Sequence, residues 1–283
     1  MQILTRLVCT DPSPFSFGGL VAILSDTRLN VQQILYDCSQ QYLTPFMKYS
    51  GYLIGKTVAV SNNINIQNLC FAQIMRSVTT FNSFGVCGFV EGNITITQTC
   101  IILNVSGKQL ENFGTIGYLQ RCVQSQFIDI SINLNTYQNS TVSGHISPLI
   151  SRSLSTNQII QQVSIQNSSM KNSHSIGPLV DDSYNQNLSI QNCTVQNINI
   201  VITNGETSGG FIAWSINSTT SITDSKIVSL YIAYTGIYQA GLILGYNAGN
   251  NTISIQGCWS EGNNYVNEIL INCANIVNTL KGC

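Results

Sequence analysis

Two histidines and a pair of adjacent aspartates are the residues best suited to acid–base chemistry in this chain. The histidines are His145 and His174, and Asp181 and Asp182 follow the second one closely. Imidazole and carboxyl groups that converge on one point serve as general acids and bases in hydrolysis and elimination. The alternative is that the aspartates belong to a surface turn. Because only 12 acidic residues are spread over the whole chain, the surface turn is the simpler interpretation, and we expect no catalytic residue.

The ten cysteines are the other side chains with chemistry of their own. Five of them recur at a similar point of an apolar alternation: Cys38, Cys70, Cys100, Cys193 and Cys258. Ser168 and Ser225 take the same place in two further copies, which predicts a small buried position and a stacked column of free thiols and hydroxyls. The alternative is that some bridges form among Cys9, Cys87, Cys122, Cys273 and Cys283. The chain has no Cys-x-x-Cys and only 2 histidines, so we expect neither a metal site nor a cofactor.

The composition excludes several classes of partner. Charged residues make up 8% of the chain, its net charge is −1, and 43% of its residues are hydrophobic. A basic surface for nucleic acid or an anionic membrane is therefore not expected, and neither is disorder. No stretch is long and apolar enough for a transmembrane segment, and Arg6 interrupts the short apolar start, so no signal peptide is evident. The chain is either intracellular or a fragment whose targeting segment lies elsewhere.

A short apolar unit recurs along the whole chain. Its core is a Gly or Pro followed by two large apolar residues, and its copies begin at Gly19, Gly51, Gly88, Gly117, Pro148, Pro178, Gly210 and Gly241. The intervals are 32, 37, 29, 31, 30, 32 and 31 residues. Repetition at such a period indicates a stacked repeat architecture, in which each unit buries its apolar face against its neighbours. We expect these anchors to stack, with Leu20, Leu53, Phe89, Leu149, Leu179, Phe211 and Leu242 in the core.

Each anchor is followed by strand-like alternations, which fix the fold class. Examples are residues 63–68, 93–97, 163–167, 188–192 and 252–256, where β-branched residues alternate with amides or hydroxyls. Helical periodicity is nearly absent, and the period fits neither leucine-rich repeats nor propeller blades. The sequence therefore predicts an all-β parallel β-helix, or β-solenoid, of about eight coils of roughly 31 residues. Residues 1–17 are expected to be an N-terminal cap or lead-in, and residues 18–283 to be the solenoid.

Outward amides form part of the same pattern. Asn68, Asn167 and Asn192 occupy similar points of their repeats. We expect them to form ladders of side-chain amides along the sheets.

Residues 240–262 resemble the GLUG motif, a short repeat of β-solenoid surface and adhesin-like proteins. The similarity lies in Ala240-Gly241-Leu242-Ile243-Leu244-Gly245-Tyr246-Asn247, in Ile253-Ser254-Ile255-Gln256-Gly257-Cys258 and in Ser260-Glu261-Gly262. Degenerate copies cover most of residues 17–262, with Pro in place of Gly at two anchors. The resemblance implies a stalk or adhesive role at a cell surface and brings no set of catalytic residues with it.

The repeat also places the histidines relative to each other. His145 and His174 each precede an anchor by three or four residues in adjacent coils, so we expect them to be neighbours near Asp181 and Asp182. Pectin-degrading β-helix enzymes cluster carboxylates in this way, but Gly144-His145 reverses their His-Gly order and their other motifs are missing.

The function that we expect is a non-catalytic solenoid, a structural spacer or adhesive surface in a larger surface or secreted protein. Its partners would be glycans or cell-surface proteins, and its location extracellular or on the cell surface. The alternative is a carbohydrate-active β-helix, which either binds polysaccharides through Tyr and Asn side chains or cleaves them as a lyase or hydrolase near His145 and Asp182.

Overall fold

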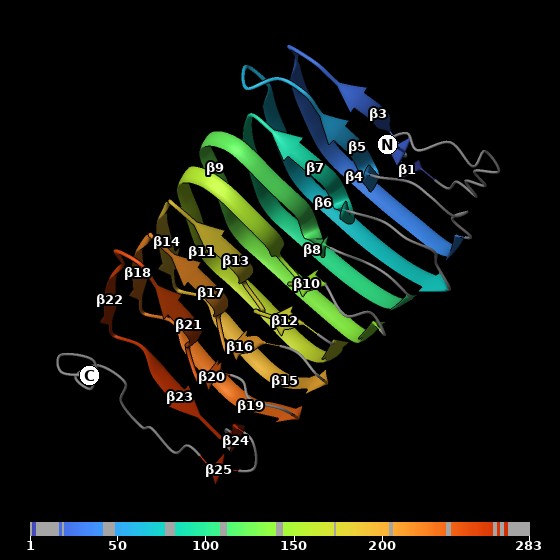
Figure 1. The fold of residues 1–283 in the computed structure, drawn as a ribbon. Helices are drawn as coiled ribbons and strands as arrows, with labels where there is room; N and C mark the ends of the chain where they lie inside the picture. Colours follow the sequence, from blue (N-terminus) through green and yellow to red (C-terminus); the bar gives the residue numbers. More distant parts are fainter. Residues whose placement is uncertain are drawn as a thin grey trace.

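The chain is a stack of β-strands. The computed structural model describes residues 2–3, 17–18, 20–41, 49–76, 83–107, 112–139, 144–172, 174–203, 206–235, 239–262, 265–266 and 269–270. All regular structure in these ranges is β-strand, and the strands stack in parallel along one axis (Figure 1). This confirms the predicted β-solenoid. It has about six turns, slightly fewer than the eight expected.

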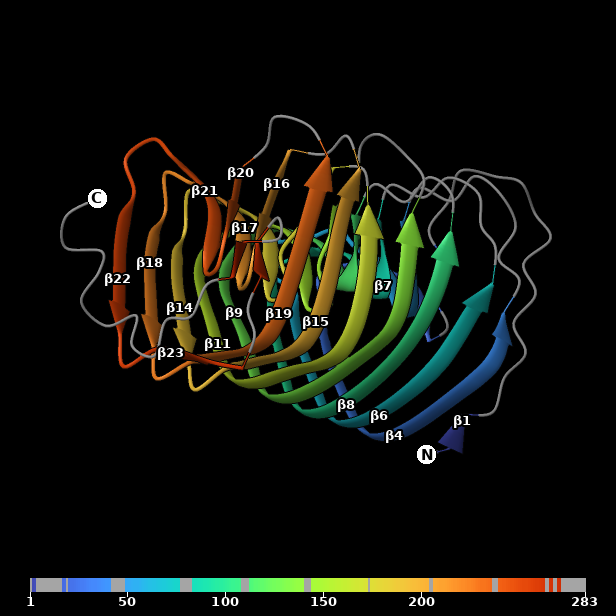
Figure 2. The same ribbon diagram turned by 90° about the horizontal axis from the view of Figure 1, so that it is seen from below.

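Each turn contains three strand stretches, which merge in the middle of the chain. Figure 2 shows the long curved strands that carry the second and third stretches. The first stretch is formed by β2 (Phe17–Gly18), β3 (Val21–Leu24), β5 (Tyr49–Thr57), β7 (Ser83–Glu91), β10 (His145–Ile146), β12 (Ser175–Ile176), β13 (Val180–Tyr184), β16 (Thr207–Gly209), β17 (Ile212–Ile216), β20 (Gln239–Gly241) and β21 (Leu244–Ala248). The second and third stretches are formed by β4 (Arg28–Gln41), β6 (Asn63–Arg76), β8 (Asn93–Gly107), β14 (Asn187–Gln191), β15 (Thr194–Thr203), β18 (Thr219–Thr223), β19 (Lys226–Thr235), β22 (Thr252–Gln256), β23 (Trp259–Glu261) and β24 (Tyr265–Val266). Two long strands run through the bends and contribute to all three stretches. They are β9 (Asn112–Asn139) and β11 (Ile150–Asn172).

The two ends of the stack are described only partly. At the N-terminal end, β1 (Gln2–Ile3) pairs in parallel with Leu35 and Tyr36 of β4. At the other end, β24 pairs with β25 (Ile269–Leu270) in antiparallel fashion. Most of the predicted lead-in, and residues 271–283, lie outside the described residues. No helix in the described part of the chain is long and apolar enough to cross a membrane.

The core is one continuous column of aliphatic and aromatic side chains. Ile160 pairs with Ile190, which pairs with Ile222, and all three are buried. The same alternation that predicted the strands places these residues inside and their amide or hydroxyl neighbours outside. Each coil therefore buries its apolar face only against the coils above and below it.

The predicted anchors stack, but not all in the register read from the sequence. Leu149 precedes a residue paired with Val180, so it stacks on Leu179, and Phe211 continues the column. All three are buried. In the last coil, Ile243 and not Leu242 takes this place in the core column. In the first coil, Leu20 was expected in the core but is exposed.

The third and fourth coils differ from the prediction for a simple reason. Each has two glycines three residues apart, Gly85 with Gly88 and Gly114 with Gly117. The first of each pair aligns with Gly51. The sequence search used the second, so Phe89 lies in register with Lys56 and Tyr118 and not with the predicted core column, although its side chain is buried.

A tight bend after the short first strand explains why glycine recurs. A Cβ on Gly51 would lie 1.9 Å from the carbonyl oxygen of Ile54, and one on Gly209 equally close to that of Ile212. Ser147 occupies the equivalent point of its coil, where its hydroxyl donates to the carbonyl of Pro178 (2.9 Å) and accepts from the amide of Ile150 (3.1 Å). We call this bend the corner, and it positions the site described below.

A second bend is made by residues in the left-handed region. Gln162, Asn192 and Asp224 occupy it in successive coils with φ of 55°, 52° and 49°. Asn68 lies at the same bend with φ of 54°, whereas Asn167, with φ of 50°, lies at the next bend in line with Asn197, so it does not share the position of Asn68 and Asn192 that the sequence suggested. The predicted outward amides therefore serve to turn the chain. Asn and Asp tolerate this conformation better than most residues. Laddering occurs as well, since Asn197 Nδ2 donates to Asn167 Oδ1 at 3.1 Å.

The predicted cysteine column is wrong in part. Cys193 and Cys258 are buried and share a column with Ser225, as expected. Ser168, which pairs with Ile198, and Cys38, which pairs with Gln73, lie outside that column. Cys70 and Cys100 are exposed. The cause is a difference of one residue, because Asn192 directly precedes Cys193 whereas Leu69 separates Asn68 from Cys70, and one residue reverses the face of a strand. All six cysteines whose side chains are described are free, and of the predicted bridging group Cys87 and Cys122 are among them.

Candidate functional site

A row of aromatic and charged side chains runs along the outside of the first strand stretch. We call it the aromatic row, and it is formed by Lys56, Phe89, Tyr118, Arg152, Asp182, Trp214 and Tyr246, which follow one another in register from coil to coil. Sequence reasoning missed this row. The signal was present, since each member follows an anchor by a few residues, but the misaligned third and fourth coils concealed it.

The members of the row contact one another across coils. Lys56 Nζ lies over the rings of Tyr49 (4.9 Å to the centroid) and Phe89 (5.5 Å). The Arg152 guanidinium lies over the ring of Tyr118 at 5.4 Å. Contacts of this kind order long cationic side chains above aromatic faces.

The row continues towards the C-terminal end in the same manner. The Arg152 guanidinium also lies 5.7 Å from the ring centroid of Tyr184, and the rings of Trp214 and Tyr246 pack edge to face with centroids 4.7 Å apart. The indole Nε1 of Trp214 is buried without a hydrogen-bond partner. The row is thus an ordered surface, largely aromatic, that spans several coils.

Asp181 occupies a position that is small in the neighbouring coils. The strand pairing of the next residue in each coil places Asp181 in line with Gly88, Gly117, Ser151, Ala213 and Gly245. This position faces the corner, because a Cβ on Gly245 would lie 2.5 Å from the carbonyl oxygen of Ser208. Stacking of the coils therefore requires only a small side chain at this position. The buried carboxyl group of Asp181 is an exception that the stacking does not explain.

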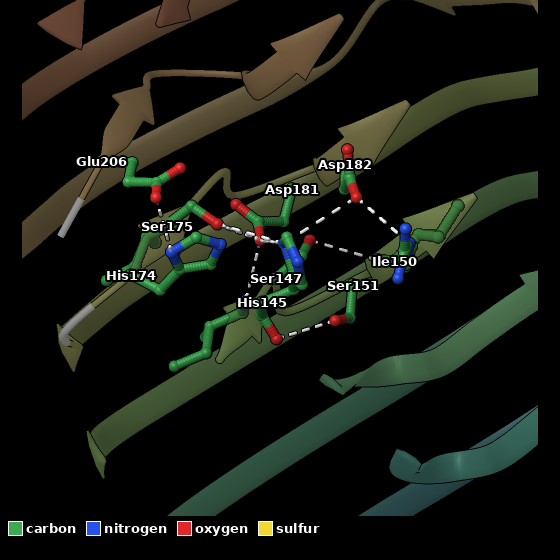
Figure 3. Close-up of polar contacts among 12 residues, drawn as sticks. His145, Ser147, Ile150, Ser151, His174, Ser175, Asp181, Asp182 and Glu206 are labelled. Carbon is green, nitrogen blue, oxygen red and sulfur yellow. Dashed lines mark hydrogen bonds and ion pairs between the residues drawn. The ribbon is translucent and has the colours of Figure 1, made fainter. Parts of the chain in front are cut away.

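The Asp181 carboxylate joins two coils at the corner (Figure 3). Its Oδ2 lies 2.9 Å from His145 Nδ1 and accepts from the amide of Ile146 (3.1 Å) and the hydroxyl of Ser175 (2.7 Å). The side chain is 0% exposed, and its Oδ1 has no hydrogen-bond partner. Carboxylate oxygens that are buried without a partner are costly.

Asp182 lies beside this group in the aromatic row. Its Oδ2 is 3.2 Å from Arg152 Nε and 3.9 Å from His145 Nδ1, and its side chain is 1% exposed. The contact with Arg152 is an ion pair without hydrogen-bond alignment, since neither atom has a hydrogen-bond partner. The Arg152 side chain is 36% exposed and therefore separates the carboxylate from solvent.

The two histidines are neighbours, as predicted from the repeat. Their rings pack edge to face with centroids 4.8 Å apart, and His174 Nδ1 lies 3.9 Å from Glu206 Oε1 (Figure 3). The sequence therefore correctly placed His145, His174, Asp181 and Asp182 together. Its preferred interpretation of the aspartates as a surface turn was wrong, because both are buried in β13.

Burial dominates the protonation of this group. It raises the pKa of Asp182 to about 6 and the pKa of Asp181 well above its usual range, although Ser175 and the nearby histidines oppose this. The pKa of His174 is lowered by its burial and then by the proximity of His145. A carboxyl with such a pKa could exchange protons near neutral pH. The oxygens of Asp182, however, lie beneath Arg152 and His145.

A surface hollow lies elsewhere, on the second strand stretch. It has a volume of about 530 Å³, and its lining includes Val123, Gln124, Asn157, Asn187, Thr219 and Ser221 from the second strand stretch. These side chains are neutral, so the hollow offers hydrogen bonds and no acid–base chemistry. In the described ranges, no three His, Cys, Asp or Glu side chains are placed to hold a metal ion together.

Comparison with protein-family models, with curated proteins and with solved structures gives no match in any of the three. The class of the protein is therefore defined by its architecture, and the chain is a β-solenoid repeat protein.

Proposed function

We propose that this chain is a non-catalytic binding solenoid, which presents the aromatic row to a glycan as part of a surface or secreted protein. The observation that carries the proposal is the row itself. Outward positions of a solenoid do not need aromatic side chains for stability, yet Tyr118, Trp214 and Tyr246 recur there in register. Aromatic side chains with a polar end combine apolar contact area with hydrogen bonding, which suits the apolar faces and hydroxyl rims of sugar rings.

The repetition of the row favours a polymeric ligand. Neighbouring rungs of a β-sheet are roughly 4.8 Å apart, so similar groups are presented at short, regular intervals. Several weak contacts along one chain add up to a stable attachment. A spacer or adhesive role in a surface protein fits this behaviour.

The resemblance of residues 240–262 to the GLUG motif supports the same role. Within that segment Tyr246 lies in the aromatic row, and Gly245 lies where a Cβ would meet the preceding coil. The motif residues therefore shape both the corner and the binding surface. An extracellular or cell-surface location is part of this proposal.

The proposal can be tested by affinity electrophoresis in gels cast with soluble polysaccharides, together with assays of reducing-end release and of unsaturated-product absorbance. We expect retarded migration with at least one neutral polysaccharide and no turnover. A protein that migrates identically in every gel contradicts the binding role.

The second candidate is cleavage of the same ligand, favoured by the pKa of Asp182 near 6 beside His145. Asp182 would protonate the leaving oxygen as a general acid. Turnover in the assays above that disappears in Asp182→Asn and in His145→Ala would establish this candidate. We place it second because the Asp182 oxygens are covered by Arg152.

A further inference from the structure

Cys70 and Cys100 form a pair of exposed thiols on the third strand stretch. They are direct partners in the parallel pairing of β6 with β8. Both are exposed, whereas the other cysteines whose side chains are described, Cys87, Cys122, Cys193 and Cys258, are buried. The same one-residue difference that disrupts the predicted column thus brings two thiols together on the surface, 30 residues apart in sequence.

The two thiols lie side by side on one exposed face of neighbouring strands. Side chains at paired positions of a parallel sheet project in the same direction, whereas a disulfide needs Cβ atoms that turn towards each other. The pair therefore remains a dithiol, and an atom inserted between the two sulfurs relieves the mismatch.

We propose that Cys70 and Cys100 are a binding site for a soft monovalent metal ion of the Cu(I) type, held between two thiolates. Thiolates select soft ions. Zinc prefers four protein ligands in closed sites, of which this pair supplies half, while Cu(I) is satisfied by two sulfurs. The site is separate from the aromatic row and does not depend on the proposed glycan binding.

Binding is coupled to proton release. Each thiol gives its proton to the buffer as its sulfur coordinates the ion, so one Cu(I) and two thiols yield one dithiolate complex and two protons. No electron is transferred. Affinity therefore rises with pH until both thiols are ionised.

The test is a titration of the reduced protein with Cu(I) against the chromophoric chelator bicinchoninate, under strictly anaerobic conditions. Cys70→Ser and Cys100→Ser are the test variants. Cys193→Ser is the matched control, because Cys193 lies one column away but is buried, and burial raises the pKa of its thiol to about 11. Circular dichroism verifies that each variant is folded.

We expect the wild type and Cys193→Ser to withdraw the same number of Cu(I) equivalents from the chelator. Each of the two test variants should withdraw one Cu(I) equivalent fewer than the wild type. The double variant should withdraw the same number as each single variant. Equal stoichiometry in wild type and both test variants would show that Cu(I) is held by other thiols and would overturn the proposal. Oxidation of the wild type to a Cys70–Cys100 disulfide, found by mass spectrometry of protein kept in air, would contradict the geometric argument.

Discussion

At the scale of single residues, Asp181 is the clearest departure from what the fold requires. Its neighbours in the column are Gly, Ser or Ala, and its own carboxylate is buried with one oxygen unpaired. Such groups reduce stability and persist where they position other side chains. Here the carboxylate fixes His145 and Ser175 beside the aromatic row.

The carboxyl pair makes the stability of the fold depend on pH. The pKa values of Asp181 and Asp182 are raised in the folded chain. Their contribution to the free energy of unfolding is therefore full below about pH 4, the pKa of an aspartate in the unfolded chain. It is lost as the pH rises through about 6. We expect the carboxyl pair to lower the free energy of unfolding, measured with urea, by roughly 1–3 kcal/mol between about pH 4 and pH 7. The lowered pKa of His174 acts in the opposite direction over this range and offsets part of the fall.

Asp181→Asn should remove part of this fall, because an amide does not titrate. The control is Asp129→Asn, which changes an exposed aspartate in a left-handed bend. The account is contradicted by a wild type whose stability does not change over this range, or by Asp181→Asn and Asp129→Asn behaving alike.

The sequence predicted which ionisable residues meet, but not their burial. The period alone brings His145 and His174 into adjacent coils, since it fixes their distance from the anchors. Whether Asp181 faces solvent or the corner depends on a tight bend one residue long. The alternation gives no information at such a bend, and the same limit explains the wrong face assigned to Cys70 and Cys100.

At the scale of elements, the bends decide the register. Strand stretches were predictable from the apolar alternation, as in residues 188–192 and β14. The bends hold residues of several types in one conformation, for example Gln98, Asp129 and Gln162 with φ of 51°, 57° and 55°. A mixture of residue types in this bend conceals its column, so the repeats were aligned on the corner glycines instead. In the third and fourth coils a second glycine three residues further on put that alignment out of register.

A glycine in this bend should stabilise the solenoid. Gln162 is exposed and has φ of 55°, a conformation that costs an L-residue roughly 1–2 kcal/mol. We expect Gln162→Gly to raise the free energy of unfolding by about 0.5–1 kcal/mol, because relief of this strain exceeds the larger conformational entropy that glycine loses on folding.

The matched control is the preceding residue, Gln161, which lies in extended conformation and pairs with Gln191. Gln161→Gly should destabilise by about 0.5–1 kcal/mol. Chemical denaturation of the two variants measures both effects, and opposite signs are the expected result. A loss of stability in Gln162→Gly would show that this bend does not depend on the left-handed conformation.

At the scale of the whole molecule, the solenoid turns a short repeated pattern into a long, regular surface. Figure 1 shows the successive rungs that carry the aromatic row from β5 to β21. No single coil presents more than one or two of these side chains, so the surface exists only in the stack. Its continuity is the central claim of the functional account, and it follows from the register and not from any one residue.

The most direct test is a printed glycan array that is probed side by side with wild type, Trp214→Ala and Tyr231→Ala. Trp214 lies in the aromatic row, while Tyr231 is an exposed aromatic residue of β19 on another stretch and serves as the control. The account predicts that Tyr231→Ala retains the wild-type pattern and that Trp214→Ala loses at least about tenfold in affinity, or roughly 1.4 kcal/mol, for every bound glycan. Equal binding by wild type and Trp214→Ala, or loss in Tyr231→Ala alone, would contradict it.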